Sequence, residues 1–144
     1  MRISGCWVEG KDSVTRPSIS TYILNSKSEW EHVVFLIDTG ADRTVFSAEL
    51  LRKLDGLPTE VGNELTGAGG STESVTVETK MRFLNDTNAP VTFSGKYFAF
   101  RSIDSLDTCV IGRDILNHFA VIIDYPGKVV ELLHGNDRYR IERA

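Results

Sequence analysis

The sequence contains little of what secreted scaffolds, membrane proteins and nucleic-acid-binding proteins need. Only two of its 144 residues are cysteine, too few for a disulfide framework, so a reduced, cytoplasmic setting is the simplest expectation. No apolar run approaches the roughly 20 residues that span a bilayer, and the first ten residues hold no apolar signal-peptide core. The 16 Lys and Arg residues are scattered among 20 acids. We therefore expect neither a membrane nor a nucleic acid as a partner.

Histidine is scarce as well. His32, His118 and His134 have neither metal-ligand spacing nor a neighbouring cysteine, so the sequence predicts no bound metal. The glycine-rich stretch TGAGGS, residues 66–71, lacks the Gly-Lys-Ser/Thr ending of a phosphate-binding loop. We expect no cofactor.

What the sequence does contain is a strong signal for β-strands. The 144 residues of the chain suit one compact domain over residues 1–144, and a composition of 41% hydrophobic and 25% charged residues predicts a packed core. Apolar and polar residues alternate over 75–83 and 19–23, as in strands with one apolar face. Residues 33–37 are apolar throughout, which predicts a strand covered on both faces.

Two hairpins are also predicted, each a pair of apolar segments around a polar turn: 91–93 with 97–100, and 120–124 with 129–133. In the second turn, Pro126 and Gly127 suit the two central positions of a type II turn.

Helix is limited to two short segments. Ser47 can cap the first, which ends before Gly56 and has one apolar face made of Ala48, Leu50, Leu51 and Leu54. The second is predicted over residues 113–119, burying Ile115, Leu116 and Phe119. The fold class is therefore mostly β, in a single domain with one or two short helices.

The stretch FLIDTGAD, residues 35–42, ends an apolar strand in Asp38-Thr39-Gly40. Alone, an Asp-Thr/Ser-Gly triplet is weak evidence, because it arises by chance in roughly one in fifteen chains of this length. Its ordinary interpretation is an Asx turn, in which Asp38 caps backbone N–H groups and Gly40 takes a positive φ.

Two further stretches change this interpretation. TGAGGS immediately precedes the long alternating strand, and CVIGRDIL, residues 109–116, runs from an apolar strand through a glycine into a helix. Taken separately, TGAGGS is explained by a flexible hairpin tip, and CVIGRDIL by ordinary strand–turn–helix packing.

In this order and spacing, the three stretches resemble the retropepsin-like (retroviral-type) aspartic proteases over residues 16–133. FLIDTGAD is similar to the catalytic loop of that family, TGAGGS to the tip of its flap, and CVIGRDIL to the strand and helix that close the core. The resemblance implies a closed, barrel-like assembly of β-strands. The hairpin and charged tail after residue 119 look more like the cellular, bacterial and retrotransposon relatives than like the shortest viral enzymes.

The chemistry of such enzymes explains the motif. Hydrolysis of a peptide by water needs a base and an acid, and two carboxylates sharing one proton supply both. This chain has one Asp-Thr-Gly triplet, so an active enzyme has to be a symmetric homodimer that contributes Asp38 twice.

The resemblance assigns roles to other residues. Thr39 is expected to hold the paired loops rigid, and Gly40 to leave room for the substrate backbone. The substrate-binding residues implied are Ala41, Asp42, Gly67, Ala68, Gly69 and Gly70. Gly112 and Arg113 are implied as structural support, with Arg113 pairing with Asp42.

These residues predict an aspartic endopeptidase that acts on extended segments of polypeptide substrates. The flap tip carries only Ala68 between its glycines, which predicts weak contacts between lid and substrate. The alternative is a non-catalytic dimeric module for peptide binding or assembly. A third possibility, the protease segment of a larger retroelement polyprotein, is disfavoured by the initiating Met1 and by the lack of a nucleic-acid-binding flank.

Overall fold

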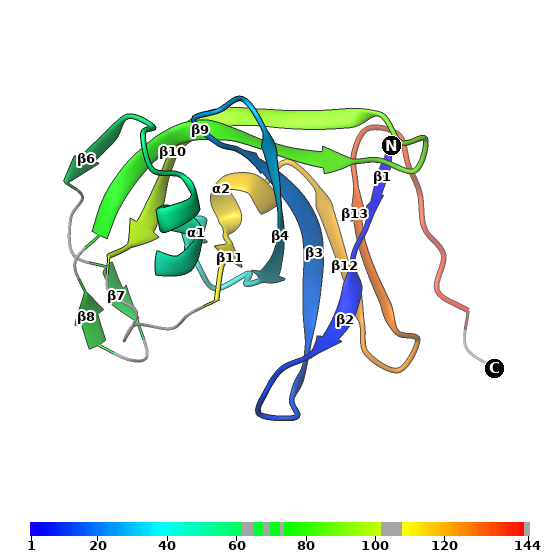
Figure 1. The fold of residues 1–144 in the computed structure, drawn as a ribbon. Coiled ribbons are helices and arrows are strands. Elements are labelled where there is room, and N and C mark those ends of the chain that lie inside the picture. The colour runs from blue at the N-terminus through cyan, green and yellow to red at the C-terminus, as the bar shows by residue number, and fades with distance from the viewer. Residues whose placement is uncertain (62–64, 68–69, 73, 102–107, 143–144) are drawn as a thin grey trace.

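The computed structural model describes residues 1–61, 65–67, 70–72, 74–101 and 108–142. Strands dominate it (Figure 1), in the order β1 (Arg2–Ser4), β2 (Cys6–Glu9), β3 (Thr15–Leu24), β4 (Trp30–Ile37), β5 (Val45–Phe46), α1 (Ala48–Lys53), β6 (Thr59–Val61), β7 (Leu65–Gly67), β8 (Gly70–Thr72), β9 (Ser74–Leu84), β10 (Pro90–Phe100), β11 (Val110–Ile111), α2 (Arg113–Leu116), β12 (Ala120–Asp124) and β13 (Val129–Leu133). The predicted mostly β fold class is confirmed.

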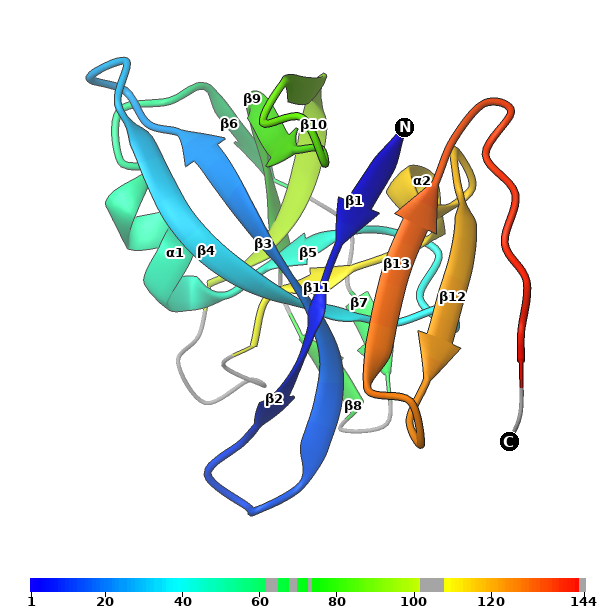
Figure 2. The ribbon, with the colours of Figure 1, turned by 90° about the vertical axis from the view of Figure 1, so that its right-hand side faces the viewer.

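The main sheet has the strand order β2-β3-β4-β11-β5-β10-β9-β6, and an additional pairing of β3 with β9 closes it. A second sheet, β1-β13-β12, lies beside it (Figure 2), and β7 and β8 form a separate hairpin. The core lies inside the closed sheet, where the largest fully buried side chains include Phe35, Phe46, Phe83 and Met81.

β4 contains the predicted strand 33–37 but is not covered on both faces. Phe35 and Ile37 are buried, whereas Val34 between them is 41% exposed. The burial alternates because only one face of β4 packs on the core. The prediction of two covered faces is therefore wrong for the single chain.

The predicted hairpin of 91–93 with 97–100 is also wrong, since β10 is one continuous strand. It pairs with β9 along its whole length, from Pro90 opposite Leu84 to Phe100 opposite Ser74. Ser94 and Lys96 are exposed around Gly95, so these three residues continue the alternation of the strand.

The hairpin instead lies between β9 and β10. There the Asn85 Oδ1 accepts hydrogen bonds from the backbone N–H groups of Thr87 and Ala89, both at 2.9 Å, and Asn88 has φ +60°. Asn and Asp residues organise turns in this way because their side chains replace backbone acceptors.

The other predicted hairpin is confirmed, as β12 and β13 pair from Ala120 opposite Leu133 to Asp124 opposite Val129. Its turn is not type II, because the positive φ of +56° belongs to Lys128 and not to Gly127. Gly127 has a different role: its N–H donates to Asp124 Oδ1 at 3.0 Å, and a Cβ there would lie 2.5 Å from Asp124 Oδ2.

α1 begins as predicted, because the Ser47 hydroxyl accepts the N–H of Leu50 at 3.2 Å, and Gly56 beyond its end has φ +94°. α2 ends at Leu116, earlier than the predicted 113–119. A 3₁₀-type turn follows the helix, in which the Phe119 N–H donates to the Leu116 carbonyl at 3.0 Å.

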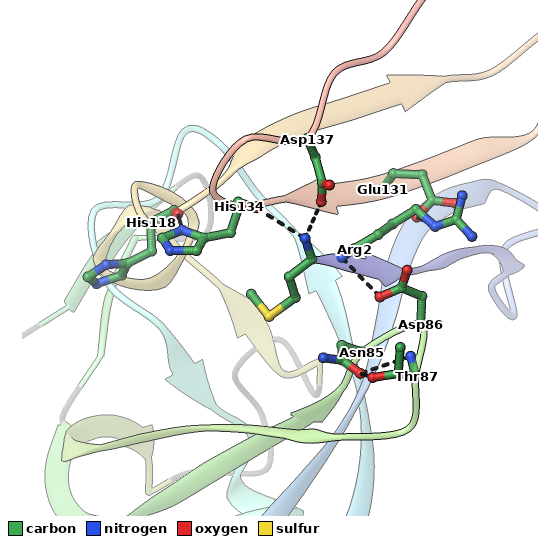
Figure 3. A network of polar contacts seen from close by, with 9 residues as sticks. Arg2, Asn85, Asp86, Thr87, His118, Glu131, His134 and Asp137 are labelled. Carbon is green, nitrogen blue, oxygen red and sulfur yellow. Dashed lines mark hydrogen bonds and ion pairs between the residues drawn. The ribbon is translucent and has the colours of Figure 1, made fainter.

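The N-terminal segment, which the resemblance left uncovered, is part of the fold. Ile3 of β1 is buried, and a Cβ at Gly5 would lie 2.4 Å from the Ser18 carbonyl oxygen. The Asp86 N–H donates to the Arg2 carbonyl at 2.8 Å, and the Met1 amino group lies against Asp137 (Figure 3).

Across the described ranges, no helix is long and apolar enough to cross a membrane. The same residues contain no group of His, Cys, Asp and Glu side chains that could hold a metal ion.

Candidate active site

β4 carries Asp38 to the point where the strand leaves the core. β4 pairs in parallel with β11, and the Asp38 N–H still donates to the Ile111 carbonyl at 3.1 Å. The Asp38 residue is half-buried, directly after the buried Ile37. The apolar strand therefore holds this carboxylate in a fixed position at the edge of the core.

The residues after Asp38 form a tight turn. Asp38 Oδ1 accepts the Gly40 N–H at 2.9 Å, and the Ala41 N–H donates to the Asp38 carbonyl at 3.2 Å. The Asx turn is thus present, but Gly40 does not have the positive φ that this interpretation expected. No hydrogen-bond partner of Asp38 Oδ2 occurs in the described part of the chain, whereas Oδ1 has the Gly40 N–H.

The structure leaves the space beside Gly40 open. A Cβ there would meet only Asp38 Oδ1, at 3.2 Å, among atoms within 4 Å. Neither the backbone conformation nor packing within the chain therefore requires a glycine at position 40. Thr39 is exposed, and the described residues offer its hydroxyl no hydrogen-bond partner. Both residues face outward from the chain.

The corner between β11 and α2 holds the loop that follows. The Arg113 N–H donates to the Ala41 carbonyl at 2.8 Å, and the Asp114 N–H donates to the Asp42 carbonyl at 3.2 Å. The Arg113 guanidinium also forms the expected ion pair with the Asp42 carboxylate, although these side chains are 49% and 78% exposed. An ion pair so exposed contributes less than about 1 kcal/mol to stability. The two backbone hydrogen bonds therefore contribute most to holding the loop against α2.

Gly112 is required by the close approach of the two segments. A Cβ at this position would lie 2.5 Å from the carbonyl of Arg43 and 2.9 Å from the carbonyl oxygen of Ala41. The Gly112 N–H donates to the Thr44 hydroxyl at 3.1 Å. A side chain here would push the Asp38 loop away from α2.

Asp114, which sequence reasoning missed, ties the loop to α2 most extensively. Its Oδ1 accepts the Thr44 N–H at 2.9 Å, the Thr44 hydroxyl at 2.7 Å and the Ile115 N–H at 3.0 Å. Thr44 is fully buried. The only signal in the sequence was an acid in the first turn of a helix, which is common in proteins.

Tyr97 lies next to this cluster, and its side chain is buried. Burial and the nearby Asp114 carboxylate raise the pKa of Tyr97 well above its usual range. Its hydroxyl donates to the Phe93 carbonyl at 3.0 Å, and its ring stacks on Phe46. The phenol therefore stays neutral and serves packing.

The predicted flap lies only partly within the described residues. β7 and β8 pair as an antiparallel hairpin in which Gly67 stands opposite Gly70. Ala68 and Gly69, the remaining residues of the predicted substrate-binding tip, lie outside the described residues.

Residues 24–115 match the sequence model of a family described as aspartyl protease, and this range includes Asp38, the β7–β8 hairpin and β11. The chain belongs to the aspartyl protease family. None of the curated proteins compared with the chain matches it.

Two solved structures resemble the chain. EIAV protease in complex with the inhibitor HBY-793 has 21% identity and a TM-score of 0.53, over 71% of this chain and 86% of that one. A retropepsin-like aspartic protease from Rickettsia conorii has 18% identity and a TM-score of 0.53, over 92% of this chain and 88% of that one. The chain therefore has a retropepsin-like fold.

The role of Asp114 in holding Thr44 can be tested with two substitutions. Asp114→Ala is expected to lower the free energy of unfolding by about 2–5 kcal/mol, because the buried N–H and hydroxyl of Thr44 lose their acceptor. Asp114→Asn keeps an acceptor oxygen in place and should cost less than half as much. Urea unfolding measures both, and equal losses would contradict the assignment of Asp114 as the acceptor that holds Thr44.

Proposed function

We propose that this aspartyl protease is an endopeptidase that hydrolyses peptide bonds within extended segments of proteins. The active site would lie on the axis of a homodimer, with one Asp38 from each subunit. The observation that supports this most is the setting of Asp38: the end of β4 holds it in place, Gly40 binds one carboxylate oxygen, and the other oxygen is without a partner in the described chain.

Two Asp38 carboxylates that share one proton can carry both halves of the reaction. The ionised carboxylate accepts a proton from a water molecule as the water oxygen attacks the carbonyl carbon, and the protonated carboxylate donates its proton to the carbonyl oxygen. The tetrahedral intermediate then breaks its C–N bond as the newly protonated carboxyl group donates its proton to the leaving nitrogen and the ionised carboxylate takes a proton from one hydroxyl group of the intermediate. This restores one carboxylic acid and one carboxylate, and releases an acid and an amine.

The outward-facing residues of the loop support the dimer. The exposed Thr39 hydroxyl would donate to the partner subunit's loop and keep the two carboxylates at a fixed separation. The open space beside Gly40 would admit the substrate backbone close to Asp38, since a Cβ there meets no atom except Asp38 Oδ1 at 3.2 Å.

The loop also limits how a peptide can be held. The carbonyls of Ala41 and Asp42 already accept hydrogen bonds from the backbone N–H groups of Arg113 and Asp114, which fixes their direction toward α2. The Asp42 carboxylate is 78% exposed, and the Asp42 N–H finds no backbone acceptor among the described residues. We propose that these two groups bind the substrate backbone on one side, and that the β7–β8 hairpin acts as a flap on the other.

We also propose that the enzyme works in the cytoplasm, without a nucleic-acid or membrane partner. The sequence contains only two cysteines, too few for the disulfide framework of a small secreted domain.

A cleavage assay tests the proposal. Purified protein is incubated with an unfolded protein and with a peptide library between about pH 4 and 7, and the products are identified by mass spectrometry. We expect cleavage within extended segments that a statine-type inhibitor suppresses. Binding of peptides without cleavage, at concentrations where the protein is dimeric, would support the non-catalytic binding module instead.

A further inference from the structure

The first part of β4 has one open edge. β4 pairs with β3 over residues 30–36, but on its other side it pairs with β11 only at Leu36 and Ile37. Among the described residues, no strand pairs with residues 30–35 on that second side. β4 is therefore covered on both sides where it approaches Asp38, and on one side only before that point.

Two residues turn their backbone groups toward this open edge. In an antiparallel pair, alternate residues of a strand point their N–H and C=O groups at the partner strand. The Val33 carbonyl accepts a β3 hydroxyl at 3.1 Å, whereas the Leu36 N–H donates to the Cys109 carbonyl, on the side of β11, at 2.9 Å. His32 and Val34 alternate with Val33, so their N–H and C=O groups face the open edge.

A cavity of about 260 Å³, the β4 groove, lies against this edge between β4 and α1 (Figure 2). The buried Leu50 and Cys109 and the half-buried Val33 bring apolar surface to its lining. The exposed Glu49 and Lys53 of α1 bring charge. The groove is smaller than the roughly 300–1,000 Å³ of pockets that enclose a drug-sized ligand. Its volume suits side chains of a chain that lies along β4.

The chemistry of the β4 groove fits an extended polypeptide. A strand laid along an open sheet edge satisfies the exposed N–H and C=O groups with its own, and its alternate side chains enter the pocket beside the edge. Here an apolar side chain would enter beside Leu50. Glu49 and Lys53 carry opposite charges and are exposed, so they add little to affinity and do not favour a ligand of one sign.

We propose that the β4 groove binds a segment of the substrate protein other than the segment that is cleaved. This inference rests on the proposed function. Val34 precedes Asp38 by four residues of nearly straight strand, which is about 13 Å at roughly 3.3 Å per residue. An extended chain needs at least about four residues to span that distance, so the bound segment and the cleaved bond are separated by at least that many.

The composition of the predicted flap gives a reason for a second contact. Its tip carries only Ala68 between glycines, which offers a substrate little apolar surface. When a second segment of the same polypeptide is already bound, binding at the active site becomes intramolecular, and the effective concentration reaches the millimolar range. Long unfolded substrates should therefore bind more tightly than short peptides with the same cleavage site.

The first test removes a backbone donor from the edge. Val34→Pro deletes the N–H that faces the β4 groove, and an edge strand tolerates proline when the missing N–H points away from its partner strand. With a reduced and carboxymethylated protein as substrate, KM should rise about fivefold or more while kcat stays within about twofold. A short peptide containing only one of its cleavage sites should show neither change. An unchanged KM for the protein, or an equal rise for the peptide, would overturn the inference.

A second variant leaves the backbone unchanged and adds a charge to the edge. Val34 is 41% exposed, and Val8 on the edge strand β2 is 39% exposed, so Val8→Lys is a matched control for Val34→Lys. Charged side chains on an edge oppose strand addition, so Val34→Lys should raise KM for the carboxymethylated protein about threefold or more. Val8→Lys should leave it unchanged. Equal effects of the two lysines would contradict a site at β4.

Photo-cross-linking locates the bound segment without catalysis. In the Asp38→Asn protein, a benzophenone amino acid replaces Glu49 or Lys53 beside the groove, or Lys80, an exposed residue of β9, as the control. We expect cross-links to the carboxymethylated protein from Glu49 and Lys53 and none from Lys80. Mass spectrometry should place them at least about four residues from a cleavage site.

Three other results would overturn the inference. Cross-links on the cleaved bond itself would make the β4 groove part of the catalytic cleft. Cross-links to a second copy of the chain, or from Glu49 to another part of its own chain, would show that the protein covers this edge itself.

The groove and the protease can also fail separately. A protein that cross-links the carboxymethylated protein from Glu49 but cleaves nothing would contradict the protease and support the groove as a site for an extended segment. A protein that cleaves this substrate but forms no cross-link from Glu49 or Lys53 would support the protease and overturn the groove.

Discussion

Asp38→Asn is expected to reduce peptide cleavage by about 10²–10⁴-fold, the usual contribution of a general acid–base group. Asparagine has nearly the same volume, and its Oδ1 can still accept the Gly40 N–H that Asp38 accepts at 2.9 Å. The turn should therefore keep its shape. What is lost is the negative charge, and with it the group that takes a proton from water.

The matched control is Asp55→Asn, because Asp55 is an exposed acid outside the loop. It should keep full activity, and both variants should unfold at the temperature of the unmodified protein. Residual cleavage above a few per cent in purified Asp38→Asn would show that another group performs the reaction.

Mixing unmodified protein with Asp38→Asn shows how many Asp38 residues each active site needs. If each site needs two Asp38 residues, a mixed dimer with one asparagine is inactive. An equal mixture of the unmodified and Asp38→Asn chains, allowed to exchange subunits, then has about a quarter of the activity of the same total amount of unmodified protein. Retention of about half would mean that each chain works alone, and the homodimeric site would be wrong.

The sequence predicted local features of the chain better than it predicted contacts between distant segments. The end of β4 at Asp38 and the Ser47 cap of α1 each depend on a few neighbouring residues, so a local pattern is enough to locate them. The turn around Gly95 was wrongly predicted because a polar Ser-Gly-Lys triplet suits both a hairpin tip and an exposed row on a long strand. Only the pairing of β9 with β10 distinguishes the two.

The sequence also does not show which distant segments come into contact. For Gly40, Gly112 and Gly127, it does not show which atoms a side chain at that position would meet. In the fold, the backbone carbonyl of Arg43 requires Gly112, whereas a Cβ at Gly127 would displace only the end of the Asp124 side chain. Asp114 could not be singled out because its partner, Thr44, lies 70 residues away. Contacts between distant segments carry no periodic signal.

The rate of cleavage should follow a bell-shaped curve in pH, with a maximum between about pH 4 and 6.5 and a fall of roughly tenfold per pH unit on each side. The pair must hold one proton: below the lower apparent pKa both carboxylates are protonated and the base is lost, while above the higher one both are ionised and the acid is lost. kcat/KM measured from pH 3 to 9 reports these values, with sedimentation at each pH separating loss of chemistry from dissociation of the dimer. Tyr97 cannot produce the alkaline limb, because its raised pKa keeps the phenol neutral in this range. A rate that climbs steadily to pH 9 while the dimer persists would exclude a shared proton between two Asp38 carboxylates and point to a different nucleophile.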